Sequence, residues 1–237
     1  MNNMPRQTLD KKDLIVRHTI LELIEHWVIA LSGILLILTG LFELPIAKRY
    51  YITELPLLAW SGDFFTSLKV HYAASVVFIT ASCFHVIYHG LLGERGLLPR
   101  KGDIKESIAV IKTFFGKGEE PPFHKYLPEQ RVAYLGMAGI IAVLIVSGLM
   151  KTYKNLIDPQ MSETLTLVAT WLHNIFFVFF VLAVIMHVGA LVLKPNRPMV
   201  RGIFTGRVRL DYAASRHPLW LGEIARVETA EPGADTQ

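Results

Sequence analysis

The fold class is indicated most directly by residues Leu165–Leu193, LTLVATWLHNIFFVFFVLAVIMHVGALVL. Its 29 residues include no Asp, Glu, Lys or Arg, yet they include His173 and His187. A helix of about 20 apolar residues crosses the hydrocarbon core of a bilayer, and its backbone satisfies its own hydrogen bonds there. The stretch therefore predicts a transmembrane helix that carries two ionisable side chains.

Three further stretches have the same character. They are Trp27–Leu44, in which only Glu43 is charged, Tyr72–Leu92 and Val132–Met150. We expect an all-α integral membrane four-helix bundle with spans at about 27–44, 72–92, 132–150 and 165–193, folded as a single domain over residues 1–237. A loop at 93–131, with a short helix at 104–115, and a tail at 194–237 complete the chain.

Lys and Arg residues gather on one side of these spans. The N-terminal segment, the loop at 93–131 and the tail hold 19 of them, and the other two connections hold 5. Because cytoplasmic connections carry the excess of basic residues, we expect both termini and the long loop in the cytoplasm, next to anionic lipid headgroups. This topology explains the net charge of +4 without nucleic acid.

Histidines at two depths carry the chemistry. A single cysteine, Cys83, excludes covalent c-type haem, an iron–sulfur cluster and a cysteine-ligated zinc site. His173 and His187 are 14 residues apart, so they share a helix face and lie about 21 Å apart along its axis. His71 and His85 repeat this offset on the second span, and His26 stands at the cytoplasmic end of the first.

Two imidazoles from different helices at one depth are the ligands of a bis-histidine haem b. His71 and His173 form the outer pair, and the residues alone leave the inner pair open among His26, His85 and His187. Zinc is the competing ligand, but we expect no carboxylate beside these histidines at membrane depth to complete its site. A purely structural role for the histidines is the other alternative.

Two cations and several glycines fit this environment. Arg17 and Lys69 are within reach of His26 and His71 for pairing with haem propionates, although each also serves as a topology determinant. Small residues let a neighbouring helix or a flat macrocycle approach closely, and the third span contains Gly136, Gly139 and Gly148.

The chain resembles the gamma subunits of membrane-bound respiratory formate dehydrogenases, which are dihaem cytochromes b. The resemblance covers about Val16 to Val227. Its motifs are V-R-x-x-x-x-E-x-x-x-H-W at Val16–Trp27, K-Y-x-x-x-Q-(K/R) at Lys125–Arg131, L-H-x(13)-H in the fourth span, and a tail with G-x-x-x-G-(K/R)-V at Gly202–Val208 and H-P-x-W at His217–Trp220.

This resemblance implies a role in electron transfer within a complex of the bacterial inner membrane. A molybdenum or tungsten alpha subunit would oxidise formate, and an iron–sulfur beta subunit would pass the electrons to the outer haem b, then the inner haem b, then menaquinone or ubiquinone on the cytoplasmic side. His71 and His173 would bind the outer haem iron, and His26 and His187 the inner one. No formate chemistry is expected on this chain, which has no soluble domain large enough for a molybdopterin.

Two departures from the family pattern concern the inner side. Leu127 and Glu129 replace an Asn and a Gly of the family motif, while Tyr126 and Gln130 remain as expected quinone contacts. His85 is not required by the pattern and is an alternative inner ligand or a group near the quinone. The cytochrome b subunit of a nickel–iron hydrogenase, a stand-alone haem b quinone oxidoreductase and a haem-free carrier or anchor are the alternative functions.

Overall fold

The computed structural model describes residues 14–113, 116, 118 and 121–230. The chain divides into two compact units. One unit is Ile20–Leu92, and the other combines the residues up to Thr19 with those from Gly93 onward. We describe each unit by itself.

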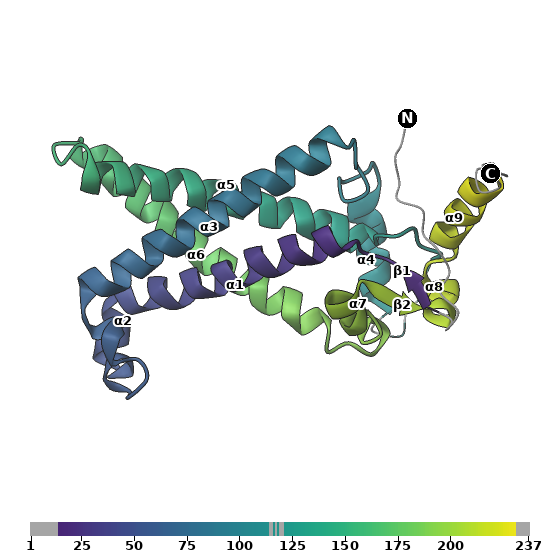
Figure 1. Cartoon of the computed structure of the whole chain (residues 1–237), viewed down its shortest axis with the longest axis horizontal. Helices are drawn as coiled ribbons and strands as arrows, with labels where there is room; N and C mark the ends of the chain where they lie inside the picture. The colour runs from purple at the N-terminus through teal and green to yellow at the C-terminus, as the bar shows by residue number, and fades with distance from the viewer. Residues whose placement is uncertain (1–13, 114–115, 117, 119–120, 231–237) are drawn as a thin grey trace, which may run out of the picture. The chain divides into compact units, whose positions relative to one another are not determined.

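The unit Ile20–Leu92 is a hairpin of two long helices. In Figure 1, α1 (Ile20–Glu43) and α3 (Phe64–Leu91) run antiparallel and side by side. The connection between them contains α2 (Pro45–Arg49) and two 3₁₀ turns, η1 (Ile52–Glu54) and η2 (Ala59–Gly62). Asp63 begins α3, because its carboxylate accepts the backbone N–H of Thr66 at 3.0 Å and satisfies an otherwise unpaired helix donor.

The other unit contains a second long hairpin, built from α5 (Pro128–Leu156) and α6 (Glu163–Ala190). The shorter α4 (Asp103–Thr113) packs against α5 (Figure 1). After α6 come a 3₁₀ turn, η3 (Lys194–Asn196), and three helices, α7 (Met199–Thr205), α8 (Leu210–Arg216) and α9 (Pro218–Ala230).

A two-stranded sheet joins the segment before α1 to the tail. β1 (Leu14–Val16) pairs antiparallel with β2 (Arg207–Arg209), and Ile15 lies opposite Val208. Gly206 adopts the left-handed conformation (φ 71°) that ends α7, and its carbonyl accepts the N–H groups of Arg17 and His18. A small apolar core forms around the sheet from Ile15, Val208, Tyr212, Ala213 and Trp220.

The expected fold class is confirmed. The described part of the chain contains four helices long and apolar enough to cross a membrane, and few of their side chains are buried inside the protein. Each begins before its apolar stretch, because polar turns continue the helix beyond the hydrocarbon core. The expected short helix at 104–115 is α4, and its last two expected residues lie outside the described range.

Candidate functional site

His71 is held by a hydroxyl group on the neighbouring helix. Its Nδ1 lies 2.8 Å from Oγ1 of Thr39, which stands near the end of α1. The Thr39 hydroxyl also donates its hydrogen to the backbone carbonyl of Leu35 at 2.8 Å. A hydroxyl has one hydrogen, so Oγ1 accepts from His71 and the Nδ1 atom carries the imidazole proton.

His173 has the same arrangement in the other unit. Its Nδ1 lies 3.1 Å from Oγ of Ser147 on α5, and this hydroxyl donates to the carbonyl of Val143 at 2.7 Å. The adjacent residue, Gly148, makes room for the ring, because a Cβ built there would lie 3.2 Å from Cε1 of His173. A Cβ built at Gly136 or Gly139 would have no other atom within 4 Å apart from its chain neighbours and the backbone of its own helix.

In the tautomer that this geometry favours, Nδ1 of each of these two histidines donates to the hydroxyl, and Nε2 carries the lone pair that a metal binds. Metal-ligating histidines characteristically donate their other ring N–H to an oxygen, which fixes the tautomer and the ring orientation. His71 and His173 therefore fit haem iron, because each can donate its Nδ1–H to an oxygen and present Nε2 to the metal. The sequence reasoning missed Thr39 and Ser147. Each is a hydroxyl residue in an apolar span, and the next span along the chain carries the histidine. That pattern could have identified them.

The inner histidines have different surroundings. His26 lies on α1 with its ring edge-on to Trp27, at a centroid distance of 5.6 Å, and His187 is an exposed residue near the end of α6. His26 and His71 belong to one unit, and His173 and His187 belong to the other. The pairings of His71 with His173 and of His26 with His187 stay predictions.

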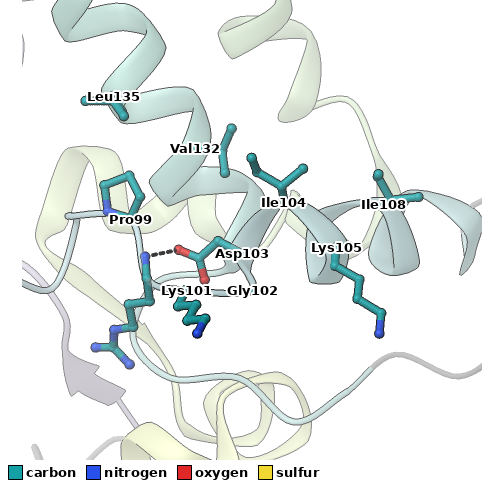
Figure 2. A pocket seen from close by; sticks show the side chains of 10 residues that line it. Pro99, Lys101, Gly102, Asp103, Ile104, Lys105, Ile108, Val132 and Leu135 are labelled. Carbon is teal, nitrogen blue, oxygen red and sulfur yellow. Dashed lines mark hydrogen bonds between the residues drawn. The ribbon is translucent and has the colours of Figure 1, made fainter.

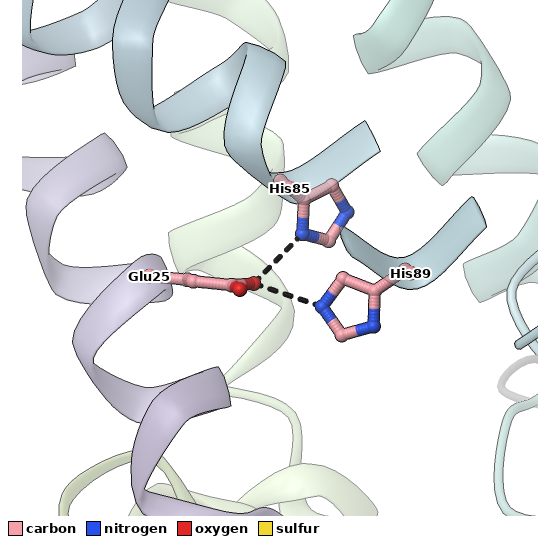
Figure 3. Close-up of side chains that lie close together, drawn as sticks. All are labelled: Glu25, His85 and His89. Carbon is pink, nitrogen blue, oxygen red and sulfur yellow. Dashed lines mark hydrogen bonds and ion pairs between the residues drawn. The ribbon is translucent and has the colours of Figure 1, made fainter. Parts of the chain in front are cut away.

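A carboxylate and two imidazoles meet in the unit Ile20–Leu92. Oε2 of Glu25 lies 3.0 Å from Nδ1 of His85 and 2.9 Å from Nε2 of His89 (Figure 3). The expectation that no carboxylate accompanies the histidines was wrong. It failed because Glu25 is distant from His85 in sequence, and only the α1–α3 hairpin brings the two side chains together.

Arg17 lies at the centre of a junction between three distant segments. Its side chain is almost completely buried, and the guanidinium donates a hydrogen bond to the carbonyl of Lys125. The same guanidinium lies over the rings of Tyr126 and Trp220, with distances of 5.8 and 5.3 Å to the ring centroids. The structure thus brings Arg17 and Tyr126 together, two residues expected at a haem and a quinone, respectively.

His217 completes this junction. Its Nδ1 donates to the carbonyl of His124 at 2.7 Å, and the N–H of Leu219 donates to the carbonyl of Phe123 at 3.2 Å. Burial, the nearby Arg17 charge and the Arg216 charge lower the pKa of His217 to about 4, so the imidazole is neutral at physiological pH. The V-R, K-Y and H-P-x-W motifs are therefore parts of one contact network.

Gln130 and Arg131 organise the start of α5. The Gln130 side chain accepts the backbone N–H of Leu127 at 3.1 Å and so caps the helix. Arg131 forms a buried two-hydrogen-bond pair with Asp103 of α4. Hydrogen bonding to Arg131 is the main reason that the pKa of Asp103 lies below its ordinary value. Glu129 is half-buried in the same turn, and Lys69 is exposed on α3.

An open pocket of about 570 Å³ lies beside this ion pair (Figure 2). Ile104 and Ile108 of α4 and Val132 and Leu135 of α5 form its apolar wall. None of its lining residues is a histidine, so the pocket contains no predicted haem ligand.

Comparison with known proteins identifies the family. The family model described as prokaryotic cytochrome b561 matches residues 17–206. A search of curated proteins found no match. The matched range includes all four long helices and the histidines His26, His71, His173 and His187. The family consists of helical membrane bundles that bind haem b and transfer electrons. The chain belongs to the prokaryotic cytochrome b561 family.

Proposed function

We propose that this protein is the dihaem cytochrome b subunit of a respiratory formate dehydrogenase and delivers electrons to quinone on the cytoplasmic side of the bacterial inner membrane. Its partners are an iron–sulfur subunit and a molybdenum or tungsten subunit. The observation that carries the proposal is the junction around Arg17. Three motifs typical of those gamma subunits, widely separated in sequence, contact one another there through Arg17, Tyr126 and Trp220.

The histidines have defined roles in this proposal. His71 and His173 bind the iron of one haem b, and His26 and His187 bind the iron of the other. When bound, haem b supplies reversible one-electron transfer between ferric and ferrous iron. The hydroxyls of Thr39 and Ser147 support the first assignment, because each fixes the tautomer that presents Nε2 to a metal.

The junction also supports the proposed topology. The N-terminal segment, the loop before α5 and the tail contact one another, which supports the proposal that they share one side of the membrane. These are the three segments with most of the basic residues, and the excess of basic residues assigns them to the cytoplasm. Quinone reduction near Tyr126 and Gln130 would then draw its protons from that side.

Haem content tests the histidine roles. A pyridine haemochromogen assay on the purified protein should give two haems b per chain, and His71→Ala and His26→Ala should each lose one. His18→Ala is a matched control, because His18 lies outside both predicted pairs, and it should keep both haems. Two haems in both ligand variants, or fewer than two in the wild type, would contradict the assignment.

Reduction by substrate tests the choice of complex. Formate added to anaerobic membranes should reduce the haems in the wild type, and the reduction should disappear when the iron–sulfur subunit is deleted. Reduction by hydrogen but not by formate would identify a hydrogenase subunit instead. A chain that purifies without any soluble partner and is reduced directly by quinol would be a stand-alone oxidoreductase.

The quinone site has its own test. Gln130→Leu should lower quinone reduction by the assembled complex while both haems remain. Loss of both haems in this variant would show that Gln130 acts through the fold alone.

A further inference from the structure

One carboxylate and two imidazoles cluster outside the predicted haem ligands His71, His173, His26 and His187. His85 and His89 are four positions apart on α3, so they lie on the same helix face about one turn apart. Their rings lie 4.6 Å apart between centroids. Glu25 reaches them from α1, and a single carboxylate oxygen lies between the two imidazoles (Figure 3).

We propose that Glu25, His85 and His89 form a binding site for a divalent zinc ion. Zinc takes imidazole nitrogen and carboxylate oxygen as ligands, and three protein ligands with one open position are typical of sites that exchange their fourth ligand. Magnesium and calcium prefer sites made entirely of oxygen, which two imidazoles do not provide. The donor set therefore selects a borderline transition metal.

The ligand atoms already lie close to the separations that zinc requires. The carboxylate oxygen lies 3.0 Å and 2.9 Å from the two ring nitrogens, and all three ligand atoms lie within 4.8 Å of one another. Tetrahedral zinc with bonds of about 2.0–2.1 Å places neighbouring ligand atoms about 3.3 Å apart. The two oxygen–nitrogen distances therefore need to lengthen by only a few tenths of an ångström to admit the ion.

Charge and burial also favour a cation at this position. Glu25 is only 5% exposed, and its second oxygen, Oε1, is buried without a hydrogen-bond partner among the described residues. A buried carboxylate is costly unless it is paired or bound to a metal. The two imidazole side chains are 25% and 16% exposed, so the cluster is not sealed inside the α1–α3 hairpin.

Zinc binding to the full-length, haem-loaded protein in detergent tests the proposal. After treatment with a chelator, titration with ZnCl₂ in a calorimeter should show one site per chain. His89→Gln should weaken binding by about 100-fold, because loss of a ligand costs at least as much as loss of the groups that orient one. X-ray absorption at the zinc edge should detect two imidazoles.

The chain provides a matched control. His124 and Glu223 form another imidazole–carboxylate pair, with 2.6 Å between Nδ1 and Oε1 but no third ligand among the described residues. His124→Gln should leave zinc binding unchanged. Haem content, which His89→Gln should also leave unchanged, shows whether that variant is folded.

Three outcomes would overturn the proposal. They are no zinc binding by the wild type, equal binding by wild type and His89→Gln, and loss of binding in His124→Gln alone. A fall in haem content in His85→Gln with zinc binding intact would instead make His85 a haem ligand.

Discussion

Two hydroxyl groups act on the outer histidines through a single hydrogen bond each. Thr39 and Ser147 each donate to the carbonyl four residues earlier, which leaves only lone pairs for the imidazole. A hydrogen bond from a Ser or Thr hydroxyl to the carbonyl four residues earlier usually weakens a helix slightly. Here it orients the hydroxyl oxygen so that it can accept a hydrogen bond from the histidine. The histidine, the hydroxyl and the carbonyl form a chain of three polar groups inside an apolar span.

Replacing this hydroxyl should therefore weaken haem binding. Thr39→Val keeps the shape of the side chain but removes the acceptor, and we expect haem affinity to fall by about 10–100-fold. Thr39→Ser should retain most of it. Ser75→Ala is the control, because the Ser75 hydroxyl donates only to the carbonyl of Tyr72. Haem retained per chain after dialysis against apomyoglobin measures the effect, and equal retention in Thr39→Val and wild type would exclude the proposed role.

Gly148 should be the most sensitive glycine of α5. Gly148→Ala places a methyl group 3.2 Å from Cε1 of His173, so the ring must shift by a few tenths of an ångström and its contact with Ser147 changes. We expect a shifted haem absorption band or reduced haem content. Gly139→Ala, whose Cβ meets nothing within 4 Å, should have a normal spectrum. Identical spectra for the two variants would show that His173 tolerates the displacement.

At the scale of single elements, the docking of α4 on α5 depends on one buried ion pair. Asp103 and Arg131 are both nearly inaccessible, and the carboxylate receives hydrogen bonds from two guanidinium nitrogens. Asp103→Ala leaves the buried Arg131 without its carboxylate, although Arg131 still donates to the carbonyl of Tyr126, and breaking a buried pair in this way costs about 3–5 kcal/mol. Amide hydrogen exchange in α4 should therefore become much faster.

The exposed pair of Arg209 and Asp211 is the matched control. Both side chains are more than 60% exposed, so water screens their attraction and removing the pair costs little stability. Asp211→Ala should leave exchange in α4 at the wild-type rate. If Asp103→Ala also left it unchanged, the apolar contacts alone would hold α4.

The pKa of Asp103 predicts the pH at which the ion pair between α4 and α5 weakens. Its folded-state pKa lies below the ordinary 3.8 because Arg131 stabilises the carboxylate. The stabilisation is therefore complete above 3.8 and is lost only as the pH falls through the folded-state pKa. Exchange in α4 should be independent of this group between pH 5 and pH 7.

The elements themselves could be read from the sequence, while the contacts between elements could not. Apolar stretches without charge located all four spans, because length and hydropathy are local properties. The contacts of Glu25 with His85, and of Arg17 with Trp220, join residues far apart in sequence, and no local pattern contains them. Gln130 shows a third case, in which the expected quinone residue also has a role as a helix cap.

At the scale of the whole molecule, His217 should make the junction sensitive to mild acid. Its pKa is lowered from 6.5 to about 4, so the unfolded tail binds a proton more readily than the folded one. Stability from this group is complete above pH 6.5 and is lost as the pH falls toward 4. After correction for the intrinsic pH dependence of amide exchange, exchange of the amides in α8 and α9 should accelerate as the pH falls from 7 to 5.

A variant without a titratable side chain at position 217 tests whether protonation of His217 causes the pH dependence. His217→Asn can still donate to the carbonyl of His124 but has no titratable group in this range. The acceleration between pH 7 and pH 5 should be much smaller in this variant. A pH dependence equal to that of the wild type would assign the effect to another residue.

The pairing of β1 with β2 sets an order of events during biosynthesis. Ile15 leaves the ribosome before any of the four spans, and its partner Val208 leaves only after all four have been made. At about 5–20 residues per second, the first strand waits on the order of ten seconds or more for the second. Closure of this small sheet is therefore a late event, and a chain that stalls before Arg207 lacks the strand that pairs with Leu14–Val16.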